Sequence, residues 1–189
     1  MKRIVPILLA AGIMMLGACK EKKQTEEIIT TKYVPKKPGA PISMQSKETV
    51  EHVSWAGKSY EVKVSRVPVD SLPMVVNEIG QKFVDNRISL TIQRSDGSVF
   101  FNKSFSKASF LSYLTADYRK EGLLSDMRFK EVKGAELSFI VTIAEPEATD
   151  DEFLPLALSV NREGGIGIKV EDDLDFLVDR DDYDEGDEE

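Results

Sequence analysis

The sequence predicts a mainly β protein: an antiparallel meander of about eight or nine strands, folded as a small sandwich or a partly open barrel, with one helix at about residues 107–120. Three observations support this fold class. From about residue 50, apolar and polar residues alternate with the period of two that strands require. Turn sequences that contain glycine separate the alternating runs. One run of helical spacing interrupts them, so an α+β fold with the helix packed on one sheet is the alternative.

The alternation is clean, which fits antiparallel sheets with one face in water better than a buried parallel sheet. The strands are expected around the alternating positions 60–64, 84–92, 137–143, 154–160 and 166–170. The strongest hairpin signal is Asp96-Gly97, because this pair favours the tight turn that joins adjacent strands. Gly134 and Gly164 mark further turns. Together these segments form one β-rich domain over residues 50–170.

A single helix is expected in the segment KASFLSYLTADYRKEG, which follows the strand FFNKSF. Its large apolar residues recur at helical spacing: Phe110, Leu111, Leu114 and Tyr118. Ser106 is a suitable N-cap, and Gly122 is a suitable stop. One helix packed against a β-rich core is therefore the simplest architecture.

The N-terminus has the pattern of a secretory signal, which we place at residues 1–18. Lys2 and Arg3 precede an uncharged run, and small residues follow it before a polar, lysine-rich segment. The apolar run has about 15 residues, fewer than the roughly 20 that a membrane-spanning helix needs. The segment is therefore expected to be a signal peptide rather than a membrane span.

Cys19, the only cysteine in the chain, is the predicted lipid attachment site. The four residues Leu16-Gly17-Ala18-Cys19 resemble the bacterial lipoprotein signal, in which cleavage occurs just before the cysteine. This resemblance implies a diacylglycerol thioether on Cys19 and an acyl chain on the new amino group. A single cysteine has no disulfide partner within the chain. A position directly after a signal also lacks the enclosed basic setting of a catalytic thiolate.

Two segments flank the domain. Residues 19–49 contain three prolines and no sustained period, so they are expected to form a lipidated tether. Residues 171–189 hold 12 acids and one arginine and are expected to form a disordered acidic tail. An EF-hand alignment of this tail puts Asp181 first and Tyr183 third, where a carboxylate ligand is required. No metal site is therefore expected.

The charge distribution argues against a nucleic-acid partner. The formal net charge is −8, but residues 171–189 alone contribute −11 and residues 1–18 contribute +2. Residues 19–170 therefore carry 22 basic and 21 acidic groups, a net charge of +1. The sequence shows no basic stripe of the kind that binds nucleic acid.

No motif identifies an enzyme, and neither a catalytic residue nor a cofactor is expected. His52 is the only imidazole available as a catalytic base, and its place at the start of the first strand favours a surface residue. Asp85, Asp126 and Glu136 are acids in or beside strands. They leave a glycosidase pair open, because carboxyl separations of about 5–10 Å are invisible in a sequence. The simpler interpretation places them on polar faces and at turn ends.

An aromatic pair is the candidate ligand platform. Trp55 and Tyr60 flank the loop AGKS. They either pair across a hairpin or in the core, or form an exposed platform for a sugar. Solvent exposure of Trp55 distinguishes these alternatives.

The segment FVDNRISLTIQRSDGSVFFNKSFSKASFLSYL, residues 83–114, resembles an uncharacterised family of lipoproteins of gut Bacteroidales, that of domain of unknown function 4738. The Asp-Gly hairpin, the FFNKSF strand and the helix after it carry the likeness. The later segment TIAEPEATDDEFLPLALSVNREGGIGI fits as well, so the resemblance covers most of the folded region. It implies an anchored, mostly β protein of the cell envelope, and it assigns no catalytic residue.

We therefore expect a lipid-anchored cell-envelope protein, held to the membrane through its N-terminal lipid, that acts as a non-catalytic binding or accessory module for a protein or glycan. Lys20 stands where lipoproteins retained at the inner membrane generally have an aspartate, so we expect the outer membrane. The periplasmic face is favoured over the cell surface, because the segment KEKK after the cysteine is mixed in charge rather than acidic. The alternative function is a hydrolase acting on envelope or dietary glycans.

Overall fold

The computed structural model describes residues 39–147 and 153–172, which all belong to the unit Lys36–Glu189. The predicted signal segment, Cys19, most of the predicted tether and most of the acidic tail lie outside the described residues. No helix among the described residues has the length and the hydropathy that crossing a membrane requires.

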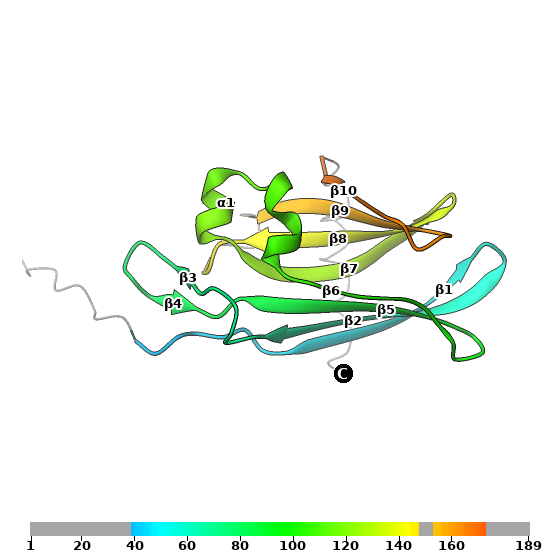
Figure 1. Ribbon diagram of the computed structural model, residues 1–189, viewed down its shortest axis with the longest axis horizontal. Helices are drawn as coiled ribbons and strands as arrows, with labels where there is room; N and C mark the ends of the chain where they lie inside the picture. Colours follow the sequence, from blue (N-terminus) through cyan, green and yellow to red (C-terminus); the bar gives the residue numbers. More distant parts are fainter. Residues whose placement is uncertain (1–38, 148–152, 173–189) are drawn as a thin grey trace, which may run out of the picture. The chain divides into compact units, whose positions relative to one another are not determined.

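The chain forms two four-stranded antiparallel sheets, which lie one above the other as two layers (Figure 1). The first sheet has the order β1-β2-β5-β6 and contains β1 (Lys47–Trp55), β2 (Lys58–Pro68), β5 (Asn86–Arg94) and β6 (Val99–Phe105). The second has the order β10-β9-β8-β7 and contains β7 (Leu123–Lys133), β8 (Glu136–Ala144), β9 (Phe153–Asn161) and β10 (Ile166–Val170). A two-residue ladder joins β3 (Val75–Val76) to β4 (Lys82–Phe83).

This architecture confirms the predicted mainly β, antiparallel fold. Of the two predicted arrangements, a sandwich or a partly open barrel, it is the sandwich, because the two main sheets stay separate. The described residues contain ten strands, slightly more than expected. The additional strands are β3 and β4, which have two residues each and are too short to show an alternating pattern.

The core lies between the two layers and follows from the alternation. On β5, Ile88, Leu90 and Ile92 are fully buried, and on β8 every second residue from Leu137 to Ile143 is fully buried. Burying a side chain of this size stabilises a fold by about 1.5–3 kcal/mol. A slip of one residue would turn all of these side chains outward, so the alternation fixes which face of each strand is inside.

The prediction of one helix is wrong, because the segment forms two. Lys107–Tyr113 is a 3₁₀ helix, η1, and Ala116–Glu121 is a short α-helix, α1. The chain is extended between them at Leu114 (φ −89°, ψ 141°), whose side chain is buried in the core. Thr115 then caps α1 by accepting a hydrogen bond from the N–H of Tyr118. Threonine favours helix starts over helix interiors, so it begins a second helix here.

Both predicted ends of the helical segment are in place. Ser106 precedes η1, and its N–H donates to Ser109 Oγ at 3.3 Å. Gly122 ends α1, and a Cβ at this position would lie 2.7 Å from Ile143 Cγ2. The absence of a side chain therefore lets the start of β7 approach β8 closely.

The fold begins ahead of residue 50, where the sequence predicts the domain to start. β1 begins at Lys47, and Ile42 forms a parallel bridge with Phe83. The guanidinium of Arg66 donates to the backbone oxygen of Gln45 at 3.0 Å. These contacts are made mainly by backbone atoms, which is why the segment shows no alternating pattern.

The fold also extends past residue 170 into the predicted acidic tail. The N–H of Glu171 donates to the backbone oxygen of Pro155 at 3.1 Å, which continues the ladder between β9 and β10. The side chain of Glu171 is buried. The first residue of the acidic segment therefore belongs to the second sheet.

Candidate functional site

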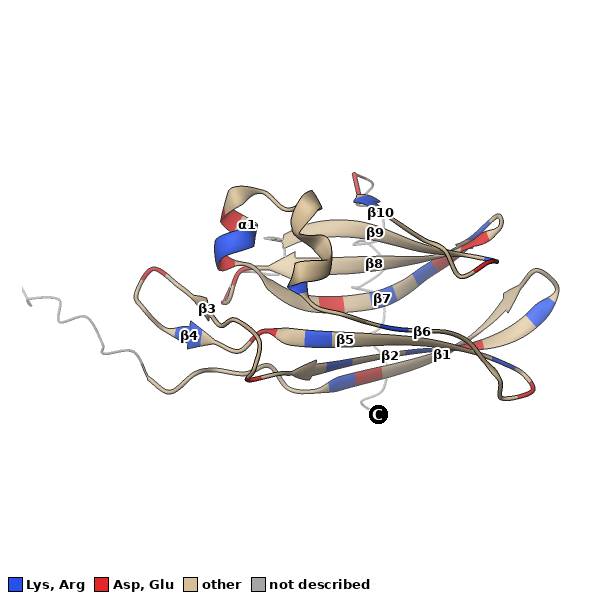
Figure 2. Ribbon diagram, viewed as in Figure 1, with Lys and Arg blue, Asp and Glu red and all other residues tan. Residues whose placement is uncertain are grey.

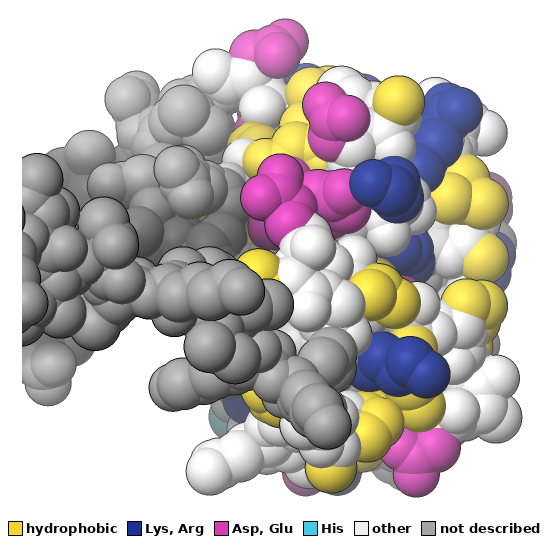
Figure 3. All heavy atoms as spheres, turned by 90° about the vertical axis from the view of Figure 1, so that its left-hand side faces the viewer, with side chains coloured by type: hydrophobic (Ala, Val, Ile, Leu, Met, Phe, Trp, Pro, Cys, Tyr) yellow, Lys and Arg dark blue, Asp and Glu magenta, His cyan; other side chains and the backbone are white. Residues whose placement is uncertain are grey.

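Charged residues of both signs are interspersed along the strands of the two layers (Figure 2). At the end that carries β3, β4 and α1, apolar side chains lie in small groups between acidic and basic ones (Figure 3). Val76 and Ile79 belong to this part of the chain and are 43% and 62% exposed. The described surface changes between apolar, acidic and basic side chains over short distances. We therefore take its hollows as the candidate sites.

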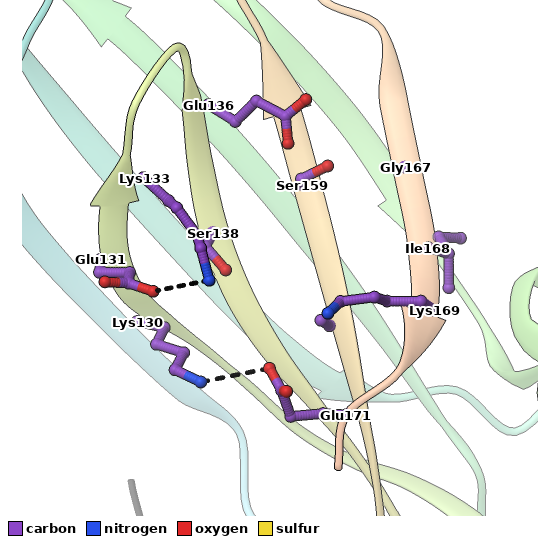
Figure 4. Close-up of a pocket in the computed structure, with 11 residues that line it drawn as sticks. Lys130, Glu131, Lys133, Glu136, Ser138, Ser159, Gly167, Ile168, Lys169 and Glu171 are labelled. Carbon is purple, nitrogen blue, oxygen red and sulfur yellow. Dashed lines mark hydrogen bonds and ion pairs between the residues drawn. The ribbon is translucent and has the colours of Figure 1, made fainter. Parts of the chain in front are cut away.

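A groove of about 360 Å³ runs over the outer face of the second sheet (Figure 4). We call it the outer groove. Its lining residues come from β7, β8, β9 and β10 and from the residue after β10: Lys130, Glu131, Lys133, Glu136, Ser138, Ala157, Ser159, Gly167, Ile168, Lys169 and Glu171. Most of them are charged or small, so the groove combines an ionic rim with an open floor.

The floor of the outer groove is a consequence of the alternation that builds the core. Because Leu137 and its alternate neighbours on β8 face inward, Ser138 faces outward. Ser138 lies opposite Ser159, and Ser159 lies opposite Gly167, so three small residues form a row across the sheet. A Cβ at Gly167 would lie 2.7 Å from Ser159 Oγ. Glycine at this position therefore leaves the hydroxyl its space.

An ion pair closes one end of the outer groove. The register of β7 shifts between Phe129 and Glu131, which makes Lys130 a bulged residue. Its Nζ lies 3.2 Å from Oε2 of Glu171, so the pair reaches over the sheet from β7 to the end of β10 (Figure 4). The two side chains are only 18% and 9% exposed. The pair therefore attaches the start of the acidic segment to the groove wall.

Two further charges at the outer groove have no ion-pair partner among the described residues. Lys169 extends from β10 across β9, and Glu136 stands on β8 at the far end (Figure 4). Both residues are exposed. The groove thus offers a cation, an anion and, between them, the hydroxyl of Ser159.

The aromatic pair is part of the core rather than a platform. Trp55 is 1% exposed, so its ring faces are not available to a sugar, and the platform interpretation is corrected. Its ring lies 5.3 Å from that of Tyr60 and 5.4 Å from that of Phe100. The three rings pack against one another at the hairpin end of the first sheet, which is the alternative that the sequence left open.

His52 lies on the outer face of the first sheet and is exposed, as the sequence predicts. It faces Glu61, which in turn faces Gln93, so the three polar side chains form a row over β1, β2 and β5. They line a shallow hollow of about 300 Å³, to which Tyr60 also contributes. This hollow and the outer groove lie on different sheets.

Asp85 is a buried acid in a structural position. Asp85 is 3% exposed, and its carboxylate accepts the N–H groups of Asn86 at 2.8 Å and of Leu124 at 3.0 Å. Burial raises the pKa of Asp85 above its ordinary value, while the two hydrogen bonds and the nearby Lys107 act in the opposite direction. The carboxylate therefore joins the start of β5 to the start of β7.

The three candidate carboxylates do not form one site. Asp126 pairs with Lys47 at 3.1 Å, and it faces Thr142, six residues along β8 from Glu136. At about 3.3 Å per residue, these positions are about 20 Å apart, well beyond the 5–10 Å of a glycosidase pair. Within residues 39–147 and 153–172, no group of three or more His, Cys, Asp or Glu residues is placed to hold a metal ion.

The sequence singled out one residue of the outer groove, Glu136, and gave Lys130, Lys169 and Glu171 no role. The pair of Lys130 and Glu171 joins residues 41 positions apart, through a bulge that no local pattern announces. The outward positions of GGIGIKVE, which are two glycines followed by a lysine and a glutamate, were the available signal.

A two-layered antiparallel β-sandwich with a polar groove on one outer face is the class of protein that these features define. A family model for a domain of unknown function, DUF4738, matches residues 27–168. The match covers both sheets and most of the chain, so the protein belongs to this family. A search of curated proteins gave no match.

Proposed function

We propose that the protein is a lipid-anchored protein of the cell envelope, attached to the outer membrane through Cys19 and facing the periplasm, and that its β-sandwich is a non-catalytic binding or accessory module. The anchor is supported by Leu16-Gly17-Ala18-Cys19 at the end of an uncharged run. Three acyl chains hold a protein far more firmly than the marginal binding of one, because each buried CH₂ contributes about 0.8 kcal/mol.

The observation that carries the binding role is the outer groove. Its rim holds charges of both signs and its floor holds the hydroxyls of Ser138 and Ser159, the pattern of a site that orients a ligand by a few polar groups. A hydrolase has less support, because Asp85 is occupied by backbone N–H groups and Asp126 lies far from Glu136. A non-catalytic module is the function that this arrangement favours.

Fatty-acid labelling of cells that express the protein tests the anchor. Wild type should incorporate labelled palmitate and partition into detergent, whereas Cys19→Ser should do neither, because the sulfur is the acceptor. Thr30→Ala is the matched control and should behave as wild type. Equal labelling of wild type and Cys19→Ser would refute the anchor.

Site-specific photo-crosslinking in the envelope tests the binding role. A photoreactive residue at Lys133, on the rim of the outer groove, should capture a ligand or partner. The matched position is Lys63, which is also exposed but lies on the outer face of the first sheet. Capture from Lys133 and not from Lys63 supports the proposal, and capture from neither would overturn the assignment of binding to this groove.

A further inference from the structure

We infer that the outer groove binds a short peptide with free termini, about three residues long, with its carboxylate at Lys169 and its ammonium at Glu136. This inference rests on the proposed binding function and assigns the class of ligand. Its basis is the set of groove charges that have no ion-pair partner among the described residues, the distance between them and the chemistry of the floor.

The charges of the groove divide into those used by the fold and those left over. Lys130 is paired with Glu171 at 3.2 Å, and Lys133 lies 3.9 Å from Glu131. The groove charges that have no ion-pair partner in the described part of the chain are the cation of Lys169 and the anion of Glu136. Since one charge of each sign remains, the complementary ligand has one charge of each sign.

The positions of these two residues set the length of the ligand. Glu136 faces Asn161 and Lys169 faces Ala157, so they are offset by four residues along β9 and stand on either side of it. With about 3.3 Å per residue and about 4.8 Å between strands, their Cα atoms lie about 16 Å apart. Both side chains extend over the groove, which brings the charged groups closer together (Figure 4). An extended peptide spans at most about 3.3–3.6 Å per residue, so three residues span about 10 Å, and the two side chains cover the rest of the distance.

The floor suits the main chain of such a peptide. The hydroxyls of Ser138 and Ser159 both donate and accept hydrogen bonds, as peptide N–H and C=O groups require. Gly167 and Ala157 add little volume beside them, which leaves room for small side chains on the ligand. An anionic ligand such as a phosphate ester fits less well, because the rim carries Glu131, Glu136 and Glu171 as well as three lysines.

Calorimetric titration of the chain from residue 19 onward, produced without the signal segment, tests the inference with tri-alanine as the probe. Saturable binding is expected. Blocking the ammonium (N-acetyl-tri-alanine) or the carboxylate (tri-alanine amide) should weaken binding about two- to fivefold each, the range for exposed ion pairs. Hexa-alanine should bind no more tightly than tri-alanine, because its termini cannot reach both charges at once.

Two substitutions test which terminus of the peptide lies at Glu136 and which lies at Lys169. Glu136→Gln should weaken tri-alanine but leave the acetylated peptide unaffected, and Lys169→Met should weaken tri-alanine but leave the amide unaffected. The matched controls on the first sheet are Glu61→Gln and Lys58→Met, which should change nothing. Both groove substitutions lie at exposed positions, so circular dichroism should show wild-type folding.

The outcomes separate this inference from the proposed function. Absence of saturable tri-alanine binding, or binding that neither groove substitution alters, would overturn the peptide assignment. Crosslinking from Lys133 in the envelope would then still support a binding role with another ligand. Absence of both tri-alanine binding and crosslinking from Lys133 would overturn the peptide assignment and the proposed function together.

Discussion

Among the described residues, acids are held out of water in two places, around Asp85 and in the outer groove, and the two places use them differently. At Asp85 the carboxylate accepts two backbone N–H groups, and Lys107 lies nearby. In the groove, Glu171 meets Lys130 beside an open volume. A buried acid with a raised pKa is often a catalytic candidate, but Asp85, which is buried and accepts two backbone N–H groups, serves the fold. Accessible space beside the charge, rather than burial, distinguishes the candidate site.

The largest expected effect is at the buried junction. Asp85→Ala leaves the N–H groups of Asn86 and Leu124 buried without an acceptor, at a cost of about 1–3 kcal/mol each. The free energy of unfolding should fall by about 2–4 kcal/mol in urea titration. Asp126→Ala, which breaks an exposed pair with Lys47, is the control and should cost less than about 1 kcal/mol. Equal losses would contradict the contrast between the two acids.

The pH dependence of stability is a second test of the role of Asp85. The pKa of Asp85 is raised in the fold, so the folded state holds its proton more tightly than the unfolded state. The stability that this proton provides is present below the unfolded pKa of about 3.9 and is lost as the pH rises through the folded pKa. In urea titrations from acid to neutral pH, the stability of wild type relative to Asp85→Asn should therefore decrease. An increase would mean that the two hydrogen bonds lower the pKa of Asp85 by more than burial raises it.

A smaller effect is expected at the closed end of the groove. Glu171→Gln removes the charge opposite Lys130 and retains the backbone hydrogen bond to Pro155. Removing one partner of a fully buried pair costs about 3–5 kcal/mol, and the partial exposure of Lys130 reduces the expected loss to about 1–3 kcal/mol. Glu48→Gln breaks the exposed pair with Lys63 and should cost less than about 0.5 kcal/mol. Thermal unfolding of both variants tests the difference.

The smallest effect on stability is expected at the open positions of the groove. Glu136→Gln and Lys169→Met remove exposed charges that have no ion-pair partner among the described residues, so unfolding free energies should change by less than about 0.5 kcal/mol. A substantial loss of stability in either variant would mean that these charges serve the fold, and the groove would then lose its distinction from the junction around Asp85.

The sequence was sufficient for the parts of the fold that follow from a local period. Alternation placed Leu137 and Ile143 in the core, and the Asp-Gly turn lies between β5 and β6. The sequence was insufficient where backbone contacts or bulges determine the structure. Ile42 joins the fold through main-chain hydrogen bonds that any residue except proline can make. Thr115 divided the helix by offering a cap inside a helical pattern.

The candidate site was less predictable than the fold for a physical reason. The outer groove depends on the bulge at Lys130, on the ladder that continues to Glu171 and on the register that sets Ser159 beside Gly167. Each of these is a relation between strands rather than a property of one strand. Trp55 was a candidate in the sequence because it flanks the loop AGKS with Tyr60, and only the packing of the two sheets shows that it lies in the core.

On our proposal, the charges of the outer groove contact a ligand, whereas those around Asp85 stabilise the fold. The most direct test is an amide NMR titration of the chain from residue 19 onward with tri-alanine. The expected result is a set of saturable shifts at Ser138, Ser159 and Lys169, with none at Asn86 or Leu124. Shifts at Asn86 and Leu124, with the groove amides unmoved, would contradict it.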